Sequence, residues 1–294
     1  WALASDNLQW NIEMGWRWMF WAEAFPALIF LVLAIIIPES PRWLAMNGKV
    51  EKARGIFNRI GGEAYAEQEL KSIADMPVQK EEGGLSVLFS KPYRLVLMIG
   101  IIVAVFQQWC GTNVIFNYAQ EIFQGAGYDV DNTFINIVVT GIANLIFTFV
   151  AIYTVDRLGR RALMLIGAGG LAAIYLMLGA CYYFHVSGIF MVALVVLAIA
   201  CYAMSLGPVT WVLLSEIFPG KVRGIAVATS TFALWMGSFT LTYSFPFLNQ
   251  GLGTYGTFWI YTAICALGFV YFYRVLPETK GKSLEELENK LVKK

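Results

Sequence analysis

Seven long apolar segments are the feature of this 294-residue sequence that most limits how the chain folds. They cover approximately residues 16–37, 92–124, 132–155, 162–184, 188–216, 223–248 and 255–276. A helix that spans a bilayer needs about 20 mostly apolar residues, which each segment supplies. Charged residues make up 14% of the chain, against roughly 25% in a typical soluble domain. We therefore expect an all-α membrane protein embedded in a lipid bilayer, which excludes a soluble enzyme, a disordered chain and a nucleic-acid binder.

Lysine and arginine residues mark one side of this predicted membrane protein. Of the 21 in the chain, 20 fall in alternate connections between the apolar segments or after residue 273. The other connections, near residues 125–131, 185–188 and 249–254, contain none. Because cytoplasmic loops are enriched in these residues, we predict a multi-pass protein of the plasma (inner) membrane. Its C-terminus is then cytoplasmic, and residues 1–15 form an external polar loop.

The one sizeable hydrophilic insertion covers residues 39–91. Lys49–Ile60 and Glu63–Ala74 carry apolar residues at helical spacing, so we predict two short amphipathic helices there. These helices either contact anionic lipid or form a solvated packing face. The chain then divides into residues 1–38 (external loop and first spanning helix), 39–91 (cytoplasmic linker), 92–276 (six-helix bundle) and 277–294 (cytoplasmic tail).

The cysteine and histidine content does not favour a metal or cofactor site. Cys110, Cys181, Cys201 and Cys265 all lie in apolar runs without CxxC spacing, and His185 is the only histidine. Thiols in such runs are small apolar packing residues, and one histidine with scattered thiols does not make a metal site. We therefore predict neither a metal nor a cofactor.

Amide side chains gather in the second apolar segment. They are Gln107, Gln108, Asn113, Asn117 and Gln120. Hydrocarbon offers amides no hydrogen-bond partner, so they face protein, water or a ligand. The last three share one helical face, whereas the glutamines point elsewhere on an ideal helix unless Gly111 breaks it. Amides donate and accept, which suits a neutral polyol, although polar residues also hold helices together.

Two further positions extend this pattern. Asn144 is an amide inside the third segment, and Trp211 follows Gly207-Pro208 in the fifth. Proline disturbs a helix, and an indole beside the break offers a platform for the apolar face of a sugar, or alternatively a packing surface. The second and fifth segments, three apart, are both interrupted. Transporters built from inverted three-helix repeats place interrupted helices in this way around their substrate.

Acidic and basic residues also recur at the predicted cytoplasmic ends of the segments. They are Glu39, Arg42, Asp156, Arg157, Arg160, Arg161, Glu216, Arg223 and Glu278. One exposed ion pair contributes only about 0–1 kcal/mol. A network that forms in one conformation and breaks in another nevertheless biases a balanced equilibrium.

These motifs resemble a known family. The strings PESPRWL, QQWCGTN, DRLGRR, GPVTWVLLSEIFP, VRG and PETKGKSLEEL occur in the order found in sugar porters of the major facilitator superfamily, and they cover nearly the whole chain. The chain is similar in particular to bacterial proton-linked xylose symporters. The resemblance implies that Gln107, Gln108, Asn113, Asn144 and Trp211 bind the sugar. It also implies that Asp156, Arg157, Gly159, Arg160, Arg161, Glu216, Arg223 and Glu278 form a cytoplasmic latch.

Two departures from the family leave the sugar undefined. The family has paired tyrosines at an external gate where this chain has Asn117-Tyr118. It also has an asparagine or glutamine before the tryptophan of the sixth segment, where Leu234 precedes Trp235. Without this amide, the protein loses a hydrogen bond to the substrate or binds a different set of the sugar's hydroxyl groups.

The family has twelve spans in two six-helix halves. The seven spans here resemble the sixth to the twelfth: the last helix of the N-terminal half and the six-helix C-terminal half. We expect the first five to be absent, together with the acidic residue that takes the proton. Glu23 and Glu216 lie off-centre in their segments, so proton coupling is not readable from these residues.

The predicted function is transport of a xylose- or glucose-like monosaccharide by alternating access with a co-transported proton. A facilitated uniporter and a homologue that senses sugar without moving it remain alternatives. A seven-helix retinal protein needs a lysine within a span to hold the chromophore, and no span here contains one. No paired intramembrane carboxylates or Ser–His constellation suggest an enzyme.

Overall fold

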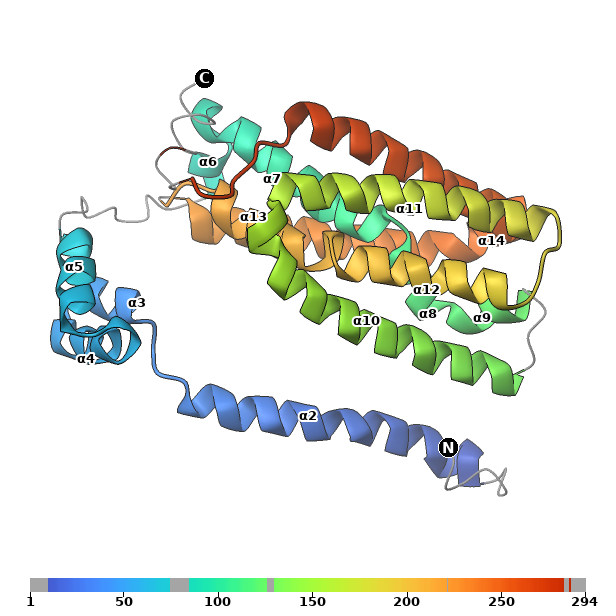
Figure 1. The fold of residues 1–294 in the computed structure, drawn as a ribbon, viewed down its shortest axis with the longest axis horizontal. Helices are drawn as coiled ribbons and strands as arrows, with labels where there is room; N and C mark the ends of the chain where they lie inside the picture. The colour runs from blue at the N-terminus through green and yellow to red at the C-terminus, as the bar shows by residue number, and fades with distance from the viewer. Residues whose placement is uncertain (1–9, 75–84, 126–129, 221, 283–285, 287–294) are drawn as a thin grey trace. The chain divides into compact units, whose positions relative to one another are not determined.

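The computed structural model describes residues 10–74, 85–125, 130–220, 222–282 and 286, and in these residues it contains helices and no strand (Figure 1). The chain divides into two compact units, Trp1–Gln79 and Lys80–Lys294. An all-helical fold is what the apolar segments predict, because only helices satisfy their own backbone groups within a single membrane-spanning segment.

The first unit contains one apolar spanning helix, α2 (Trp16–Ile36). Its 21 residues reach about 32 Å at 1.5 Å per residue, which matches a hydrocarbon core. A π-helical turn, η1 (Asn11–Gly15), leads directly into it. The prediction of a loop up to residue 15 is therefore wrong for residues 10–15, since the backbone at Gly15 is already helical (φ −56°, ψ −48°). Residues 1–9 of that predicted loop lie outside the described residues.

Three short helices follow: α3 (Pro41–Met46), α4 (Val50–Gly61) and α5 (Glu63–Ala74). Both predicted amphipathic helices are confirmed, each within a residue of its expected bounds. The sequence reading missed α3, which starts where the Ser40 hydroxyl accepts the Trp43 N–H and proline occupies the first turn. The three helices enclose a small core of Leu44, Ala53, Phe57 and Ala66.

The second unit is a helical bundle. Its helices are α6 (Leu85–Leu88), α7 (Lys91–Trp109), α8 (Thr112–Asn117), α9 (Ala119–Gly125), α10 (Val130–Leu158), α11 (Arg160–Tyr183), α12 (Ile189–Ala203), α13 (Leu206–Ile217) and α14 (Arg223–Val275). Helix α11 packs against α12 and α14, and α7 packs against α14 (Figure 1). One continuous apolar core joins these helices.

Helix α14 is two spanning helices joined at a kink. Its 53 residues would reach about 80 Å as one helix, far beyond one bilayer crossing. Gly253 has non-helical angles (φ 71°, ψ 170°), and both parts run along α7, the first with Gly237 beside Trp109 and the second with Gly268 beside Phe106. In the described residues, six apolar helical stretches are long enough to cross a membrane, and they account for the seven predicted spans, the last two being this hairpin (Figure 1).

The second and fifth predicted spans are both interrupted. Helix α7 ends at Trp109, and Gly111 adopts a left-handed conformation (φ 91°) before α8 begins, which confirms the predicted break. In the fifth span the break falls at Met204-Ser205, earlier than the predicted Gly207-Pro208. Proline is tolerated in the first turn of a helix, where no backbone donor is needed, so Pro208 sits inside the start of α13.

Candidate functional site

The buried amides at the α7–α8 break form one hydrogen-bonded chain. Gln107 Nε2 donates to the Tyr202 hydroxyl at 2.7 Å, and Gln108 Nε2 donates to Gln107 Oε1 at 2.6 Å. Asn113 Nδ2 donates in turn to Gln108 Oε1. We call Tyr202, Gln107, Gln108 and Asn113 the amide chain. Both glutamines are buried, at 5% and 6% exposure, so these hydrogen bonds satisfy groups that would be costly to leave unpaired.

The break at Gly111 is what brings Gln108 and Asn113 together. Five residues separate them, which on an uninterrupted helix places their side chains about 140° apart. The left-handed backbone at Gly111 redirects the chain and turns α8 so that Asn113 reaches back to Gln108. The sequence reading proposed this unwinding, and the hydrogen-bond geometry agrees with it.

Tyr202 is the member of the amide chain that the sequence reading missed. It lies in the last turn of α12, just before the α12–α13 break. Its hydroxyl accepts from Gln107, 95 residues away in sequence. The two interrupted helices therefore meet at this pair. A polar ring at the end of an otherwise apolar helix, next to a predicted break, was the signal available in the sequence.

Asn144 and Trp211 stand apart from the amide chain in hydrogen bonding. Asn144 lies partly buried on α10, and its backbone carbonyl accepts from the Thr148 hydroxyl at 2.7 Å. Trp211 lies on α13 with 44% of its surface exposed. Within the described part of the chain, neither side chain has a hydrogen bond to the amide chain. Their assignment as sugar ligands stays a prediction, and the exposed indole of Trp211 is free to meet a ligand.

The residues predicted at the external gate connect α8 to α14. The Tyr118 hydroxyl donates to the Thr242 backbone carbonyl at 3.0 Å, and Asn117 Nδ2 donates to Thr242 Oγ1 at 3.4 Å. The Tyr118 ring also packs on Phe245, with centroids 4.5 Å apart. The C-terminal end of α8 is thus tied to the first part of α14 at Thr242, a residue that the sequence reading did not identify.

The sixth-span position at which the family carries an amide is apolar and buried here. Leu234 is 1% exposed, whereas Trp235 is 64% exposed. Leu234 therefore belongs to the packed core of the bundle, and it supplies no hydrogen bond to a ligand.

A charge network lies at the opposite end of the bundle. Arg160 forms a bidentate pair with Glu216, Nη2 to Oε1 at 2.9 Å and Nε to Oε2 at 3.2 Å. Its Nη1 also contacts Asp156 at 2.9 Å, and the Thr279 hydroxyl donates to Glu216 at 2.6 Å. The Arg160 side chain is 12% exposed and that of Glu216 26%. Bidentate guanidinium–carboxylate pairs are among the stronger polar contacts in proteins.

Glu278 completes this charge network by capping a helix. Its carboxylate accepts the backbone N–H groups of Arg160 (3.0 Å) and Arg161 (3.2 Å) at the start of α11. It also accepts those of Thr279 and Lys280, each at 3.0 Å. Unpaired donors and the helix dipole make this end of α11 attractive to a carboxylate. We define the charge network as Asp156, Arg160, Glu216, Glu278 and Thr279.

The side chains of the other predicted latch arginines contact backbone carbonyls or a tyrosine hydroxyl. Arg161 Nη2 donates to the Tyr273 carbonyl at 2.6 Å, and Arg157 Nη2 donates to the Tyr153 hydroxyl at 2.6 Å. Arg223 Nε donates to the Phe218 carbonyl at 3.2 Å. These cations fix helix ends. Glu39 and Arg42 belong to the Trp1–Gln79 unit, and their place in a latch stays a prediction.

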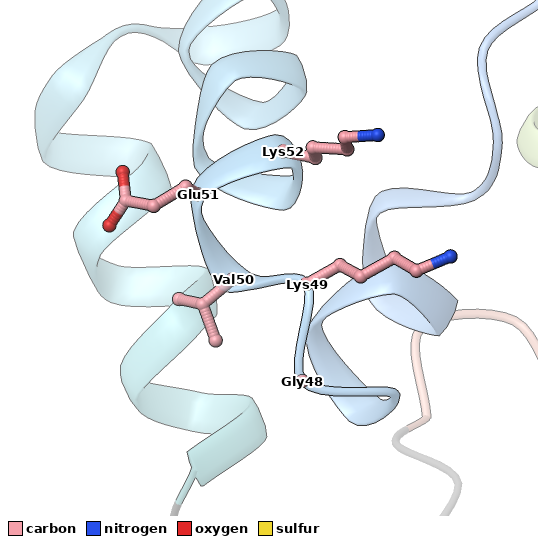
Figure 2. A pocket seen from close by; sticks show the side chains of 5 residues that line it. All are labelled: Gly48, Lys49, Val50, Glu51 and Lys52. Atoms are coloured by element: carbon pink, nitrogen blue, oxygen red, sulfur yellow. The ribbon is translucent and has the colours of Figure 1, made fainter.

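Two hollows lie in the Trp1–Gln79 unit. One, of about 300 Å³, is lined by Gly48–Lys52, with Lys49 and Lys52 extending to the same side and Glu51 pointing away (Figure 2). A second, of about 420 Å³, extends to Pro38, Glu39 and Arg59. Both are open at the surface and contain no member of the amide chain. Among the described residues no metal-binding group of three or more His, Cys, Asp or Glu side chains is found.

Comparisons with known proteins agree on one family. The model of the family described as "Sugar (and other) transporter" matches residues 3–291. The arabinose-proton symporter of Bacillus subtilis is 38% identical over 290 residues, covering 98% of this chain and 62% of that protein. The D-xylose-proton symporter of Escherichia coli is 39% identical over 291 residues, covering 97% and 59%.

Two further similar proteins are named for glucose transport by facilitated diffusion and for proton-linked xylose transport. The glucose facilitated diffusion protein of Zymomonas mobilis is 35% identical over 298 residues, covering 98% of this chain and 62% of that protein. The solved structure of the proton:xylose symporter XylE bound to 6-bromo-6-deoxy-D-glucose superposes with a TM-score of 0.81 at 37% identity, covering 97% and 61%. The chain therefore spans about three fifths of the length of these relatives.

Proposed function

The chain belongs to the sugar transporter family and has the major facilitator fold of a multi-pass membrane protein, and from this premise we propose that the protein moves a monosaccharide across a membrane by alternating access. The substrate class that we propose is a xylose- or glucose-like sugar. The membrane is the plasma (inner) membrane, with the C-terminus in the cytoplasm.

The observation that carries this proposal is the amide chain. It places two glutamines, an asparagine and a tyrosine hydroxyl where the two interrupted helices meet. Interrupted helices at corresponding positions of a repeat surround the substrate in transporters of this architecture. Amides that are paired with one another can exchange these bonds for sugar hydroxyls without leaving a buried group unsatisfied.

Asn144 and Trp211 complete the proposed sugar site. The indole of Trp211 supplies an apolar face for the sugar ring and an N–H for a hydroxyl, and its 44% exposure keeps both available. Asn144 supplies a further donor and acceptor from α10. In this proposal the amide chain reads the hydroxyl pattern and Trp211 supports the ring.

We propose that the charge network holds the bundle in one conformation. Arg160 and Glu278 join the start of α11 to the segment after α14, and Glu216 adds the end of α13. Opening of this end for sugar release breaks these contacts. Their combined free energy therefore sets the balance between the two conformations.

Proton symport is the coupling mode that we propose, and facilitated uniport is the alternative. Two of the relatives are named as proton symporters and one as a facilitated diffusion protein. A homologue that binds sugar without moving it would carry the same amide chain, so transport has to be measured directly.

The test uses the complete gene product reconstituted in liposomes. Radiolabelled D-xylose and D-glucose are offered to vesicles preloaded with the same unlabelled sugar. Counterflow that is blocked by excess unlabelled sugar supports transport, whereas binding without exchange identifies a sensor. Uptake against a gradient that is driven by an imposed inward proton gradient supports symport. Counterflow without such uptake identifies a uniporter.

A further inference from the structure

The left-handed turn at Gly111 is pressed against one aromatic ring. A Cβ atom at Gly111 would lie 2.8 Å from Cγ and 2.9 Å from Cδ2 of Tyr261, on the second part of α14. Tyr261 is 1% exposed, and its hydroxyl has no hydrogen-bond partner in the described structure. The ring of Tyr261, rather than its hydroxyl, therefore makes the contact with the break.

The residues on both sides of Gly111 are held by two neighbouring helices, α11 and α14. The Thr112 hydroxyl lies 3.1 Å from the Tyr175 hydroxyl on α11. The Cys265 thiol on α14 donates to the Cys110 carbonyl at 3.5 Å. Thr112 and Cys110 are both fully buried. The break is thus fixed before, at and after its glycine.

Tyr261 is itself held in an aromatic group that we call the socket: Tyr175, Phe258 and Tyr261. Ring centroids in the socket are 5.7 Å (Tyr175 to Phe258), 6.3 Å (Tyr175 to Tyr261) and 6.4 Å (Phe258 to Tyr261) apart. All three side chains are at most 1% exposed. Close-packed rings of this kind resist displacement, so the socket is a rigid support.

The far end of α8 is held differently. Phe116 is 38% exposed and Asn117 is exposed, and the Tyr118–Thr242 hydrogen bond ties this end to the first part of α14. A single hydrogen bond makes only a modest net contribution to stability. Helix α8 therefore has one end fixed by buried packing and another end with exposed side chains at Phe116 and Asn117, before α9 (Ala119–Gly125) returns to the buried core.

We propose that Tyr261 is a positioning residue for transport: its ring, seated against Gly111, fixes the pivot about which α8 swings over the sugar. The inference rests on the proposed transport function and adds to it a residue that does not touch the sugar. Asn113 lies on α8 and Gln108 on α7. A fixed pivot keeps the side chains of Asn113 and Gln108 at a constant relative position while α8 closes over the sugar.

The test measures the motion of α8 in the complete gene product, purified in detergent. Phe116→Cys places a thiol on α8, and Ser187→Cys places a matched exposed thiol in the connection between α11 and α12. The rate of maleimide labelling at each position is measured with and without saturating D-xylose or D-glucose, whichever shows counterflow. Each reporter is combined with Tyr261, Tyr261→Phe, Tyr261→Leu or Tyr261→Ala.

We expect sugar to slow labelling at position 116 at least fivefold with Tyr261 and with Tyr261→Phe, which keeps the ring. With Tyr261→Leu or Tyr261→Ala we expect the effect to fall below twofold, while the sugar Kd from intrinsic fluorescence changes less than threefold. Position 187 should not respond to sugar in any variant. A role in stability alone would lower the melting temperature and leave the sugar-dependent ratio at position 116 intact.

Retention of fivefold protection with Tyr261→Leu would overturn the proposal, as would its loss with Tyr261→Phe. Where Tyr261→Ala or Tyr261→Leu fails to fold, Gly111→Ala with Tyr261 intact presses a methyl group into the same ring and is expected to abolish the protection. Absence of counterflow with the unsubstituted protein would instead contradict the proposed function.

Discussion

Gly159 and Glu278 approach so closely that a Cβ atom on Gly159 would lie 2.7 Å from the Oε2 atom of Glu278. The backbone of Gly159 is also in a region that favours glycine (φ 88°). This closeness lets the carboxylate reach the first N–H groups of α11. The glycine of the DRLGRR motif is thus explained by the cap that it makes possible.

Gly159→Ala is expected to destabilise the charge network. The new methyl group collides with the Glu278 carboxylate, and the backbone conformation at φ 88°, ψ 157° costs a non-glycine residue about 1–3 kcal/mol. We expect a lower melting temperature and a conformational balance displaced toward the open cytoplasmic end. The melting temperature is read by differential scanning fluorimetry, and the balance by thiol labelling at that end of the bundle.

Gly281→Ala is the matched control for this change. Gly281 also has a positive φ (69°), but a Cβ atom there would have no neighbour within 4 Å. It therefore adds backbone strain without the collision. Equal effects of the two substitutions would show that contact with Glu278 is irrelevant.

Glu216→Gln is expected to weaken the same end of the bundle by removing the bidentate partner of Arg160. The Arg160 side chain is only 12% exposed, so its charge loses its main compensation. We expect a loss of about 1.5–3 kcal/mol, the range for a hydrogen bond to a charged group. Chemical denaturation of the purified protein measures this loss.

Asp156→Asn is the comparison for Glu216→Gln, because it removes the other carboxylate that contacts Arg160. The Asp156 side chain is 76% exposed, and exposed pairs contribute about 0–1 kcal/mol. We expect Asp156→Asn to change stability by less than half the effect of Glu216→Gln. The reverse order would contradict the assignment of Glu216 as the main partner.

Much of the fold was predictable because hydropathy and charge asymmetry are strong signals over 20-residue segments. The seven spans, both amphipathic helices and the break at Gly111 were predicted from residue type and spacing. The location of the second break was not, because Pro208 fits the first turn of α13 and the backbone opens at Met204-Ser205, before that helix begins. Helix α3 was not predicted, because its six residues are too few to show a helical periodicity in the sequence.

The site was predictable only in part, because its contacts join residues far apart in sequence. Gln107 and Asn113 were found as amides in an apolar run, whereas Tyr202 and Thr242 were not. Their roles depend on which helices pack together. The socket residue Tyr261 carries no local signal at all, since a tyrosine in an apolar span is ordinary until Gly111 lies against it.

Gln108→Ala is expected to weaken sugar binding at least tenfold, which corresponds to about 1.4 kcal/mol. Gln108 is an inner member of the amide chain and contacts both Gln107 and Asn113. Its loss removes the link between α7 and α8. Equilibrium binding of labelled sugar to the complete gene product measures the effect.

The control for Gln108→Ala is Gln250→Ala, because Gln250 is an exposed amide. We expect no change in sugar affinity there. Tyr202→Phe provides an intermediate test, since it removes the acceptor of Gln107 Nε2 and leaves a buried donor unpaired. Unchanged affinity in both Gln108→Ala and Tyr202→Phe would exclude the amide chain from the sugar site.

Tyr118→Phe is expected to speed release of sugar past α8. The substitution removes the hydrogen bond to the Thr242 carbonyl and keeps the ring contact with Phe245. Loss of one such bond, about 0.5–1.5 kcal/mol, corresponds to an increase of about 2- to 13-fold in the opening rate. The sugar dissociation rate, measured by dilution from the labelled complex, should rise within this range while the melting temperature stays nearly constant. The comparison for Tyr118→Phe is Thr242→Val, which removes the weaker 3.4 Å contact to Asn117 and leaves the Thr242 carbonyl in place. Its effect on the sugar dissociation rate should therefore be smaller. A larger effect of Thr242→Val would mean that Asn117, not Tyr118, holds the far end of α8.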